Sequence, residues 1–243
     1  MKLICFGDSL TFGSVGHSYV KYLKETTSYT AKNKGVNGDT TMHMLNRLNV
    51  FLDHSNPEIS DTYIICIGIN DLLLPYLTSV SQLWKIQMKP RIEMMQCLSD
   101  DNLFRKKYRE IIECILSKQQ DLIILGLPYL EIKDFPNDKI DKRNKIIKDL
   151  ALEYKIAYID TKAIQSEISN NITVQYSWKH KNFLRLIEGI IFPVMPILKD
   201  YFSNVRHLCF TDDGVHWNSV LAKRISSQIA KVLTLKNNTH IFL

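Results

Sequence analysis

The sequence predicts an α/β fold in which a mostly parallel sheet is covered on both faces by helices. Four short apolar runs lie far apart along the chain, and each is followed directly by Gly or Asp; they are residues 3–6, 63–67, 122–125 and 156–159. Continuous apolar runs of this length are typical of parallel strands buried on both faces. The stretches between them carry apolar residues at three-to-four spacing, which is typical of helices. This alternation indicates parallel strand–helix–strand units.

A fifth strand is expected at residues 28–34, mainly because the turn sequence GVNG at residues 35–38 follows it. Residues 103–116 and 140–152 have helical periodicity and are predicted to be crossover helices. Near the end of the chain, Asn218 is expected to cap a closing helix, whose apolar stripe is Leu221, Ile225, Ile229 and Val232 or Leu233.

The chain is expected to form a single domain over residues 1–243. This length lets one α/β domain bury a core without disulfides or metals. Two stretches exceed a minimal five-strand layout and are interpreted as insertions, at about residues 73–100 and 165–207. In the second, an apolar run at residues 183–192 is interrupted by Arg185 and Glu188 and followed by Pro193. This pattern predicts an amphipathic helix that ends at the proline.

Charge does not indicate a nucleic-acid partner. The chain has 31 Lys plus Arg against 25 Asp plus Glu, a net charge of +6. Its densest basic groups, residues 105–107 and 142–143, fall in helical stretches, where charges usually form a solvated face. No aromatic residues interleave with them as base-stacking platforms would. We therefore expect no nucleic acid among the partners.

The sequence also contains no pattern that indicates a metal site, a disulfide or a membrane segment. Five cysteines are an odd number, and Cys5 and Cys66 lie in apolar strand-like runs where a thiol acts as a small hydrophobe. There is no CxxC pair and no HExxH helix to bind zinc. No run approaches the roughly 18 apolar residues of a membrane helix, and the apolar start is too short for a signal peptide. The protein is expected to be cytoplasmic, with no integral membrane segment.

Ser9 is the first candidate for chemistry, in the sequence GDSLTFG at residues 7–13. A serine in a sharp turn after a buried strand has its hydroxyl at the rim of the sheet, next to a helix N-terminus that favours negative charge. Such a placement suits a nucleophile. The alternative is that Ser9 is a helix N-cap, which is a common role for serine.

Asp213 and His216 are the second candidates, in the sequence TDDGVHW at residues 211–217. A carboxylate three residues before a histidine can accept a hydrogen bond from Nδ1, which fixes the tautomer and stabilises the imidazolium that forms when Nε2 takes a proton from serine. The alternative is a capping aspartate beside a surface histidine.

Acyl transfer also needs hydrogen-bond donors for a developing oxyanion. Gly38 could offer a backbone N–H and Asn70 its side-chain amide, because each follows a predicted strand. Ordinary turn residues would look the same. The neighbouring Asp8 and Asp71 are expected to hold their turns through side-chain to backbone hydrogen bonds. The other histidines lack an evident acidic partner and are interpreted as surface or structural; they are His17, His43, His54, His180, His207 and His240.

Taken together, these four blocks resemble the SGNH branch of the GDSL esterase/lipase family. The family's blocks centre in order on Ser, Gly, Asn and His. The matching positions are Ser9 in GDSL, Gly38 in GVNGDT, Asn70 in GIND and His216 in DGVH, where Asp213 precedes the histidine by three residues. The resemblance covers nearly the whole chain, and the insertion at residues 165–207 is longer than the family's minimal form needs.

The resemblance implies a three-layer α/β/α, flavodoxin-like fold with a mostly parallel five-stranded sheet and a helical insertion. It implies Ser9 as nucleophile, His216 as general base and then acid, and Asp213 as the carboxylate that orients it. The oxyanion donors would be the backbone N–H groups of Ser9 and Gly38 and the amide of Asn70. It implies neither a metal nor an organic cofactor.

The leading hypothesis is hydrolysis of a carboxylic ester through an acyl-serine intermediate, on a small-molecule, lipid or carbohydrate ester. Two alternatives are an O-acyltransferase with the same acyl-serine, and a non-catalytic binding module. The aliphatic segment at residues 183–202 could roof an acyl pocket, form a subunit contact or add core packing at the sheet edge. The acyl group, the alcohol and the oligomeric state stay open at this point.

Overall fold

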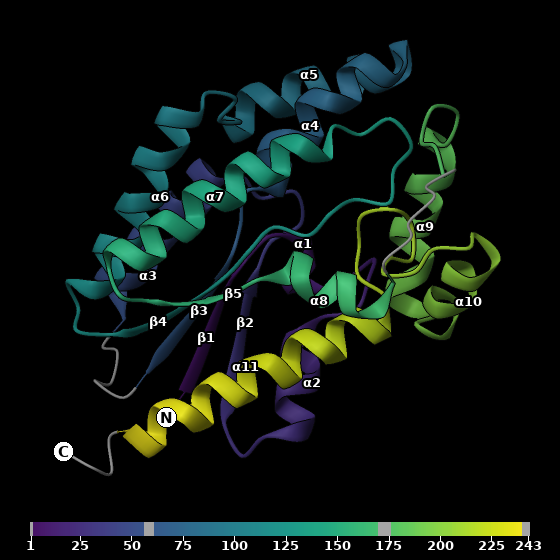
Figure 1. Ribbon diagram of the computed structural model, residues 1–243. Helices are drawn as coiled ribbons and strands as arrows, with labels where there is room; N and C mark the ends of the chain where they lie inside the picture. The colour runs from purple at the N-terminus through teal and green to yellow at the C-terminus, as the bar shows by residue number, and fades with distance from the viewer. Residues whose placement is uncertain (1, 56–60, 170–175, 240–243) are drawn as a thin grey trace.

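A five-stranded parallel sheet forms the centre of the computed structural model (Figure 1), which describes residues 2–55, 61–169 and 176–239. Its strand order is β2-β1-β3-β4-β5, and every neighbouring pair is parallel. The strands are β1 (Lys2–Gly7), β2 (Thr30–Gly35), β3 (Thr62–Cys66), β4 (Asp121–Leu125) and β5 (Ala157–Ile159). The predicted α/β fold class and the five parallel strands are confirmed.

Burial explains why β1, β3 and β4 were clear in the sequence and β2 was weak. All five residues of β3 are buried, and β1 and β4 are buried except at their first residue. At the edge of the sheet, β2 exposes Thr30, Lys32 and Asn33. It begins two residues later and ends one residue later than the predicted 28–34. An edge strand of this kind needs few apolar residues, because one of its sides has no neighbouring strand.

Helices cover both faces of the sheet and complete three layers (Figure 1). On one face lie α3 (Thr41–His54), α6 (Asp101–Leu116) and α7 (Asn137–Glu153). On the other lie α2 (Tyr19–Thr26), α8 (Thr161–Ile168) and the closing helix α11 (Ser219–Thr239). As predicted, Asn218 caps α11: its Oδ1 accepts a hydrogen bond from the backbone N–H of Leu221 at 3.1 Å.

Two short segments follow strands at the sheet edge where the candidate residues gather. The one-turn helix α1 (Ser9–Phe12) follows β1 directly, and α4 (Ile69–Val80) follows β3. Parallel strands bring their carboxyl ends to one edge of the sheet. The candidates Ser9 and Asn70, which are far apart in the sequence, therefore come to the same edge.

The two stretches interpreted as insertions are mostly helical. The first contains the end of α4 and all of α5 (Gln82–Met95); the second contains α9 (Asn182–Val194) and α10 (Ile197–Val205). Pro193 was expected to end the helix, but α9 continues through it to Val194. Pro193 has no N–H to donate to the backbone oxygen of residue 189, and its ring crowds that oxygen. The helix extends only one residue beyond the proline, so little helical structure depends on the lost bond.

Aromatic packing joins the two insertions. The rings of Trp84 on α5 and Trp178, just before α9, stack with centroids 5.6 Å apart. The indole N–H of Trp84 also donates a hydrogen bond to the backbone oxygen of Trp178 at 2.9 Å. Both side chains are buried. The insertions therefore pack against each other through these two tryptophans.

Within the three described ranges, no helix has the length and apolar character required to cross a membrane. All five cysteines lie in the described residues and are free thiols.

Candidate active site

Ser9 is the first residue of α1, immediately after β1. The helix N-cap is Asp8, whose side chain accepts a hydrogen bond from the backbone N–H of Leu10 at 2.9 Å. The alternative role considered for Ser9, that of N-cap, is thus filled by its neighbour. The Ser9 hydroxyl is free to make other contacts, and the residue is 7% exposed.

His216 links that hydroxyl to Asp213. Its Nε2 lies 3.0 Å from Ser9 Oγ, and its Nδ1 lies 2.6 Å from Asp213 Oδ2. An ionised carboxylate can only accept hydrogen bonds, so Nδ1 carries the ring hydrogen of the neutral imidazole. Nε2 is then left to accept the hydrogen bond from the serine hydroxyl. The structure brings the three predicted residues together in the order that proton transfer from serine requires.

Asp213 is fully buried, and several donors hold it in place. Its Oδ1 accepts hydrogen bonds from the backbone N–H groups of Val215 at 2.8 Å and His216 at 2.7 Å. The indole N–H of Trp178 donates a hydrogen bond to the backbone oxygen of Asp213 at 2.7 Å. Burial opposes ionisation, but the charge of Arg185 and the charge and hydrogen bonds of His216 outweigh it and hold the pKa of Asp213 well below its usual range.

Arg185 is a site residue that the sequence pattern did not reveal. It projects from α9, and its guanidinium contacts Asp213 Oδ2 on one side and Glu188 on the other. Arg206 contacts the second oxygen of Glu188, so two arginines enclose this buried carboxylate. In the sequence, Arg185 and Glu188 stood out only as interruptions of an apolar run. A charge pair at i,i+3 within such a run was the available signal.

Gly38 and Asn70, the predicted oxyanion donors, lie on the same cavity as Ser9 and His216. Gly38 has φ of +75°, a conformation that favours glycine. A Cβ there would lie 1.8 Å from a guanidinium nitrogen of Arg91. Asn70 donates one side-chain hydrogen bond to the backbone oxygen of Asp39 at 2.8 Å. An amide nitrogen carries two hydrogens, so this bond orients the group while leaving the second hydrogen for a ligand.

The cavity above these residues has a volume of about 230 Å³. Its walls include the aliphatic side chains Leu73, Leu74 and Leu77 from α4, and both insertions contribute the remaining side: Trp84, Met88 and Arg91 from α5, and Asn182, Arg185 and Leu186 from α9. Of the roles left open for the segment at residues 183–202, α9 contributes to two: Arg185 and Leu186 line this cavity, and Phe192 is buried. The opposite side of α9 exposes Phe183 and Ile190.

Asp8 and Asp71 hold the backbone, as predicted. Asp71 accepts hydrogen bonds from the backbone N–H of Thr41 at 3.0 Å and of Leu98 at 2.7 Å, so it ties α3 and the start of the α6 segment to α4. Burial raises the pKa of Asp71, and it raises the pKa of Asp8 to about 8, with the charges of Asp39 and Asp71 adding to the effect. Both carboxyls are buried structural groups.

Glu131 is a second residue that the sequence did not indicate. Its carboxylate accepts hydrogen bonds from the backbone N–H groups of Cys209 at 2.6 Å and Phe210 at 3.0 Å, and from the Thr211 hydroxyl at 2.6 Å. Its own backbone N–H donates to Gly214 at 2.8 Å. Glu131 therefore fixes the loop that carries Asp213 and His216, although burial raises its pKa.

The expectation that the other histidines lack an acidic partner was wrong for two of them. His43 Nδ1 lies 2.5 Å from Asp39, four residues earlier on the chain, and His17 Nε2 lies 3.5 Å from Asp200. Burial lowers the pKa of His17 to about 4. The i,i+4 spacing of Asp39 and His43 was visible in the sequence, whereas the pairing of His17 with Asp200 depends on the fold. His240 lies outside the described residues.

Comparisons with known proteins agree with this fold. Three solved structures that the chain resembles are a lipolytic G-D-S-L family member from Veillonella parvula (16% identity, TM-score 0.59), a lipase/acylhydrolase from Enterococcus faecalis (17%, 0.59) and the acetyl xylan esterase AlAXEase (17%, 0.58). The alignments cover 96%, 97% and 96% of this chain, and 98%, 97% and 99% of the respective neighbours. At this identity, they establish the fold.

No curated protein sequence matches the chain significantly. A family model, however, matches residues 5–181, a range that includes Ser9, Gly38 and Asn70 and ends before the Asp213–His216 loop. The match extends over more than half of the chain. The chain therefore belongs to the GDSL-like lipase/acylhydrolase family.

Proposed function

We propose that this protein is a serine-dependent carboxylic ester hydrolase that acts on esters with short acyl groups. The observation that carries the proposal is the continuous hydrogen-bonded chain from Ser9 through His216 to Asp213, with its serine end at the cavity. Hydrogen-bond donors at Gly38 and Asn70 line the same cavity. A nucleophile, a base and oxyanion donors around one space are the parts that acyl transfer needs.

In the proposed first half-reaction, Ser9 Oγ attacks the ester carbonyl carbon while His216 Nε2 takes its proton. The negative charge that forms on the carbonyl oxygen is stabilised by the backbone N–H groups of Ser9 and Gly38 and by the Asn70 amide. The C–O bond to the alcohol then breaks, and the alcohol leaves with the proton from Nε2. The product that stays on the enzyme is an acyl ester of Ser9.

In the second half-reaction, water attacks this acyl ester and gives its proton to His216 Nε2. Collapse of the second tetrahedral intermediate breaks the bond to Ser9 Oγ, and the proton returns to the serine. The carboxylic acid leaves. Throughout, Asp213 keeps Nδ1 protonated and stabilises the imidazolium.

The size and lining of the cavity support a short acyl group. A volume of about 230 Å³ lies below the roughly 300–1,000 Å³ of pockets that enclose drug-sized ligands. One neighbour of similar fold is named as an acetyl xylan esterase, so acetylated sugars belong in the first substrate panel beside simple acetyl and butyryl esters.

The test is hydrolysis of p-nitrophenyl esters of increasing chain length, together with labelling by a fluorophosphonate probe at pH 8. We expect acetyl or butyryl esters to be cleaved and Ser9 to be labelled. Ser9→Ala and His216→Ala should each lose about 10⁶-fold in kcat and Asp213→Asn about 10⁴-fold, by analogy with serine proteases. Ser117→Ala, at an exposed serine after α6, is the matched control and should keep full activity. Undiminished hydrolysis by the Ser9→Ala variant would contradict the proposal.

A further inference from the structure

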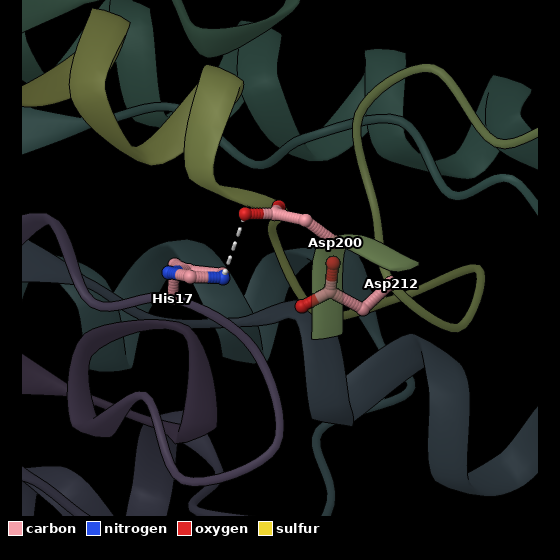
Figure 2. A group of neighbouring side chains, drawn as sticks. All are labelled: His17, Asp200 and Asp212. Atoms are coloured by element: carbon pink, nitrogen blue, oxygen red, sulfur yellow. Dashed lines mark ion pairs between the residues drawn. The ribbon is translucent and has the colours of Figure 1, made fainter. Parts of the chain in front are cut away.

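Three side chains that could bind a metal ion meet beside the loop of Asp213 and His216 (Figure 2). They are His17, Asp200 and Asp212, and their ligand atoms lie within 4.8 Å of one another. His17 comes from the segment between α1 and α2, Asp200 from α10 in the second insertion, and Asp212 from the residue before Asp213. Figure 2 shows the two carboxylates and the imidazole converging from these three segments.

Asp212 is the strongest indication of a ligand. It is 0% exposed, and among the described residues neither of its carboxylate oxygens accepts a hydrogen bond. In Figure 2 its carboxylate points toward the space between His17 and Asp200. Burying a carboxylate without a partner is costly, and buried charges in proteins are normally paired or coordinate metals. Within the part of the chain that the structure describes, the charges of Lys199 and Arg206 act on this carboxylate only from a distance, and neither binds its oxygens.

The imidazole of His17 presents a nitrogen to the same space. Its Nδ1 is 3.0 Å from the hydroxyl of Tyr22, whereas its Nε2 is buried without a hydrogen-bond partner among the described residues. A histidine that ligates a metal usually donates its other ring N–H to an oxygen, which fixes the ring. If Nδ1 donates to the Tyr22 oxygen, the lone pair of Nε2 faces the cluster.

The two carboxylate oxygens of Asp200 also have different contacts: one makes a structural hydrogen bond and the other faces the cluster. Its Oδ1 accepts a hydrogen bond from the backbone N–H of Ser219 at the start of α11, at 3.0 Å. Its Oδ2 faces His17 Nε2 at 3.5 Å, too far for a good hydrogen bond. The side chain is 45% exposed, which gives an ion a route from solvent.

The ammonium group of Lys199 does not fill the place of a cation in the cluster. Lys199 Nζ donates hydrogen bonds to the backbone oxygens of Gly13 at 3.1 Å and Gly16 at 2.7 Å. Its charge offsets part of the negative charge of Asp200 and Asp212, and Lys21 and Lys223 also act on His17 from a distance. A metal ligand has to be deprotonated, so binding of a divalent ion would release the proton that burial keeps on Asp212. The ion then supplies the positive charge that this ionised carboxylate needs beside Lys199 and Arg206.

We propose that His17, Asp200 and Asp212 form a binding site for a divalent transition metal ion, for which zinc is the best match. One imidazole nitrogen and two carboxylate oxygens form a set that zinc accepts, with water as a fourth ligand. Calcium and magnesium prefer sites made of oxygen atoms.

The site would stabilise the loops that carry the triad. Asp212 directly precedes Asp213, and the backbone N–H of Asp212 donates a hydrogen bond to the backbone oxygen of His216 at 2.8 Å. The backbone N–H of His17 donates a hydrogen bond to the backbone oxygen of Trp217 at 2.7 Å. A metal bound to these side chains joins the segment after Ser9, the triad loop and the second insertion. Its role is structural, because the catalytic steps proposed above do not use it.

The test starts with chelator-treated full-length protein, to which Zn²⁺ is added in a calorimetric titration. We expect one equivalent to bind, and Tm to rise by roughly 5–10 °C when free zinc is about 100-fold above its Kd. His17→Gln and Asp212→Asn should each abolish this binding. His207→Gln and Asp53→Asn, at exposed positions, are controls for adventitious binding and should bind zinc as the unaltered protein does.

Co²⁺ gives a second readout that does not depend on stability. Its visible absorption should show a tetrahedral site in the unaltered protein and in Ser9→Ala, and lose it in His17→Gln. If the Ser9→Ala variant keeps the Co²⁺ absorption, the metal site is shown to form independently of the proposed esterase activity. Equal binding by His17→Gln, by Asp212→Asn and by the unaltered protein, or no stoichiometric binding at all, would overturn the proposal.

Discussion

Arg185 contacts the same oxygen of Asp213 that accepts the hydrogen bond from His216 Nδ1. A helix of the second insertion therefore reaches the carboxylate of the proposed triad. The guanidinium competes with the imidazolium for this negative charge. Its positive charge also opposes protonation of groups close to it. The insertion is thus placed to set the pH range in which the base can work.

The first prediction concerns Arg185→Gln. Removal of this positive charge should make proton uptake at the triad easier, so that the acid limb of kcat/KM moves to higher pH. We expect a movement on the order of one pH unit, as for other buried charge pairs. The measurement is a pH–rate profile with a short p-nitrophenyl ester. The variant should also be less stable, by about 3–5 kcal/mol, because Glu188 loses one of its two arginines.

Two variants separate charge from geometry in that experiment. Arg185→Lys keeps the positive charge and should keep the acid limb close to its original position. Arg224→Gln removes an arginine on α11 that is 56% exposed, and should leave the profile unchanged. If Arg185→Gln gives the same profile as Arg224→Gln, the guanidinium has no influence on the titrating groups.

The second prediction concerns Gly38→Ala. The new methyl group would occupy the space of the Arg91 guanidinium, and φ of +75° would strain any residue with a Cβ, by about 1–2 kcal/mol. Both effects displace the backbone N–H that we assign to the oxyanion. Loss of one such donor should lower kcat by about 10²–10³-fold. Steady-state kinetics on a folded sample, checked by circular dichroism, measures this.

A double variant tests the steric part of that effect. Arg91→Ala alone should change kcat little, and combined with Gly38→Ala it should recover part of the lost activity. Additive losses in the double variant would mean that Arg91 is not what displaces the alanine.

The third prediction concerns Asp8→Asn and the pH dependence of stability. The folded pKa of Asp8 is about 8, above the ordinary value of 3.8, so the folded protein holds a proton that the unfolded chain releases between these values. Stability therefore falls as pH rises through this window and levels off above the folded pKa. Asparagine can keep the bond from Leu10 but cannot ionise. The decrease in Tm from pH 5 to pH 8 should be smaller in the variant.

The slope should be reduced rather than removed. Burial and the charges of Asp213 and Asp200 raise the pKa of Asp212 to about 9, which acts in the same direction. Asp100→Asn is the matched control, because Asp100 is an exposed N-cap on α6. A slope that is equally steep in Asp8→Asn and in the unaltered protein would show that Asp8 is ionised in the fold.

The fourth prediction concerns the length of the acyl group. Leu77→Ala shortens a buried side chain that lines the cavity, so the preferred ester should become longer. Leu52→Ala, on α3, removes a side chain of the same size from the core away from the cavity. Both should cost about 2–5 kcal/mol of stability. Chain-length profiles that change equally in both variants would exclude Leu77 as a wall of the acyl pocket.

The central sheet could be predicted because its strands are buried on both faces, so that residues such as Tyr63, Ile64 and Ile65 form an unbroken apolar run. The edge strand β2 could be located only through the turn that follows it. The end of α9 differs from the prediction by a single residue after Pro193, and helix ends vary by one or two residues. The exact ends of helices and strands depend on small differences in free energy.

Some residues of the candidate site could be predicted from local motifs, and others could not. Ser9, Gly38, Asn70, Asp213 and His216 could be proposed because each lies in a short motif beside a strand end or helix start. Arg185 reaches Asp213 across 28 residues, and Glu131 reaches Thr211 across 80. No local pattern encodes such pairs, since they form when the insertion and the loops dock. The same holds for the cluster of His17, Asp200 and Asp212.

The stacked rings of Trp84 and Trp178 give the molecule a built-in optical reporter. Three tryptophans occur in the whole sequence, and the third, Trp217, is fully buried beside His216. If α5 swings away from α9 to admit a bulky ester, two of three fluorophores become hydrated while the third keeps its surroundings. Intrinsic emission would therefore report a separation of α5 from α9 without any attached dye.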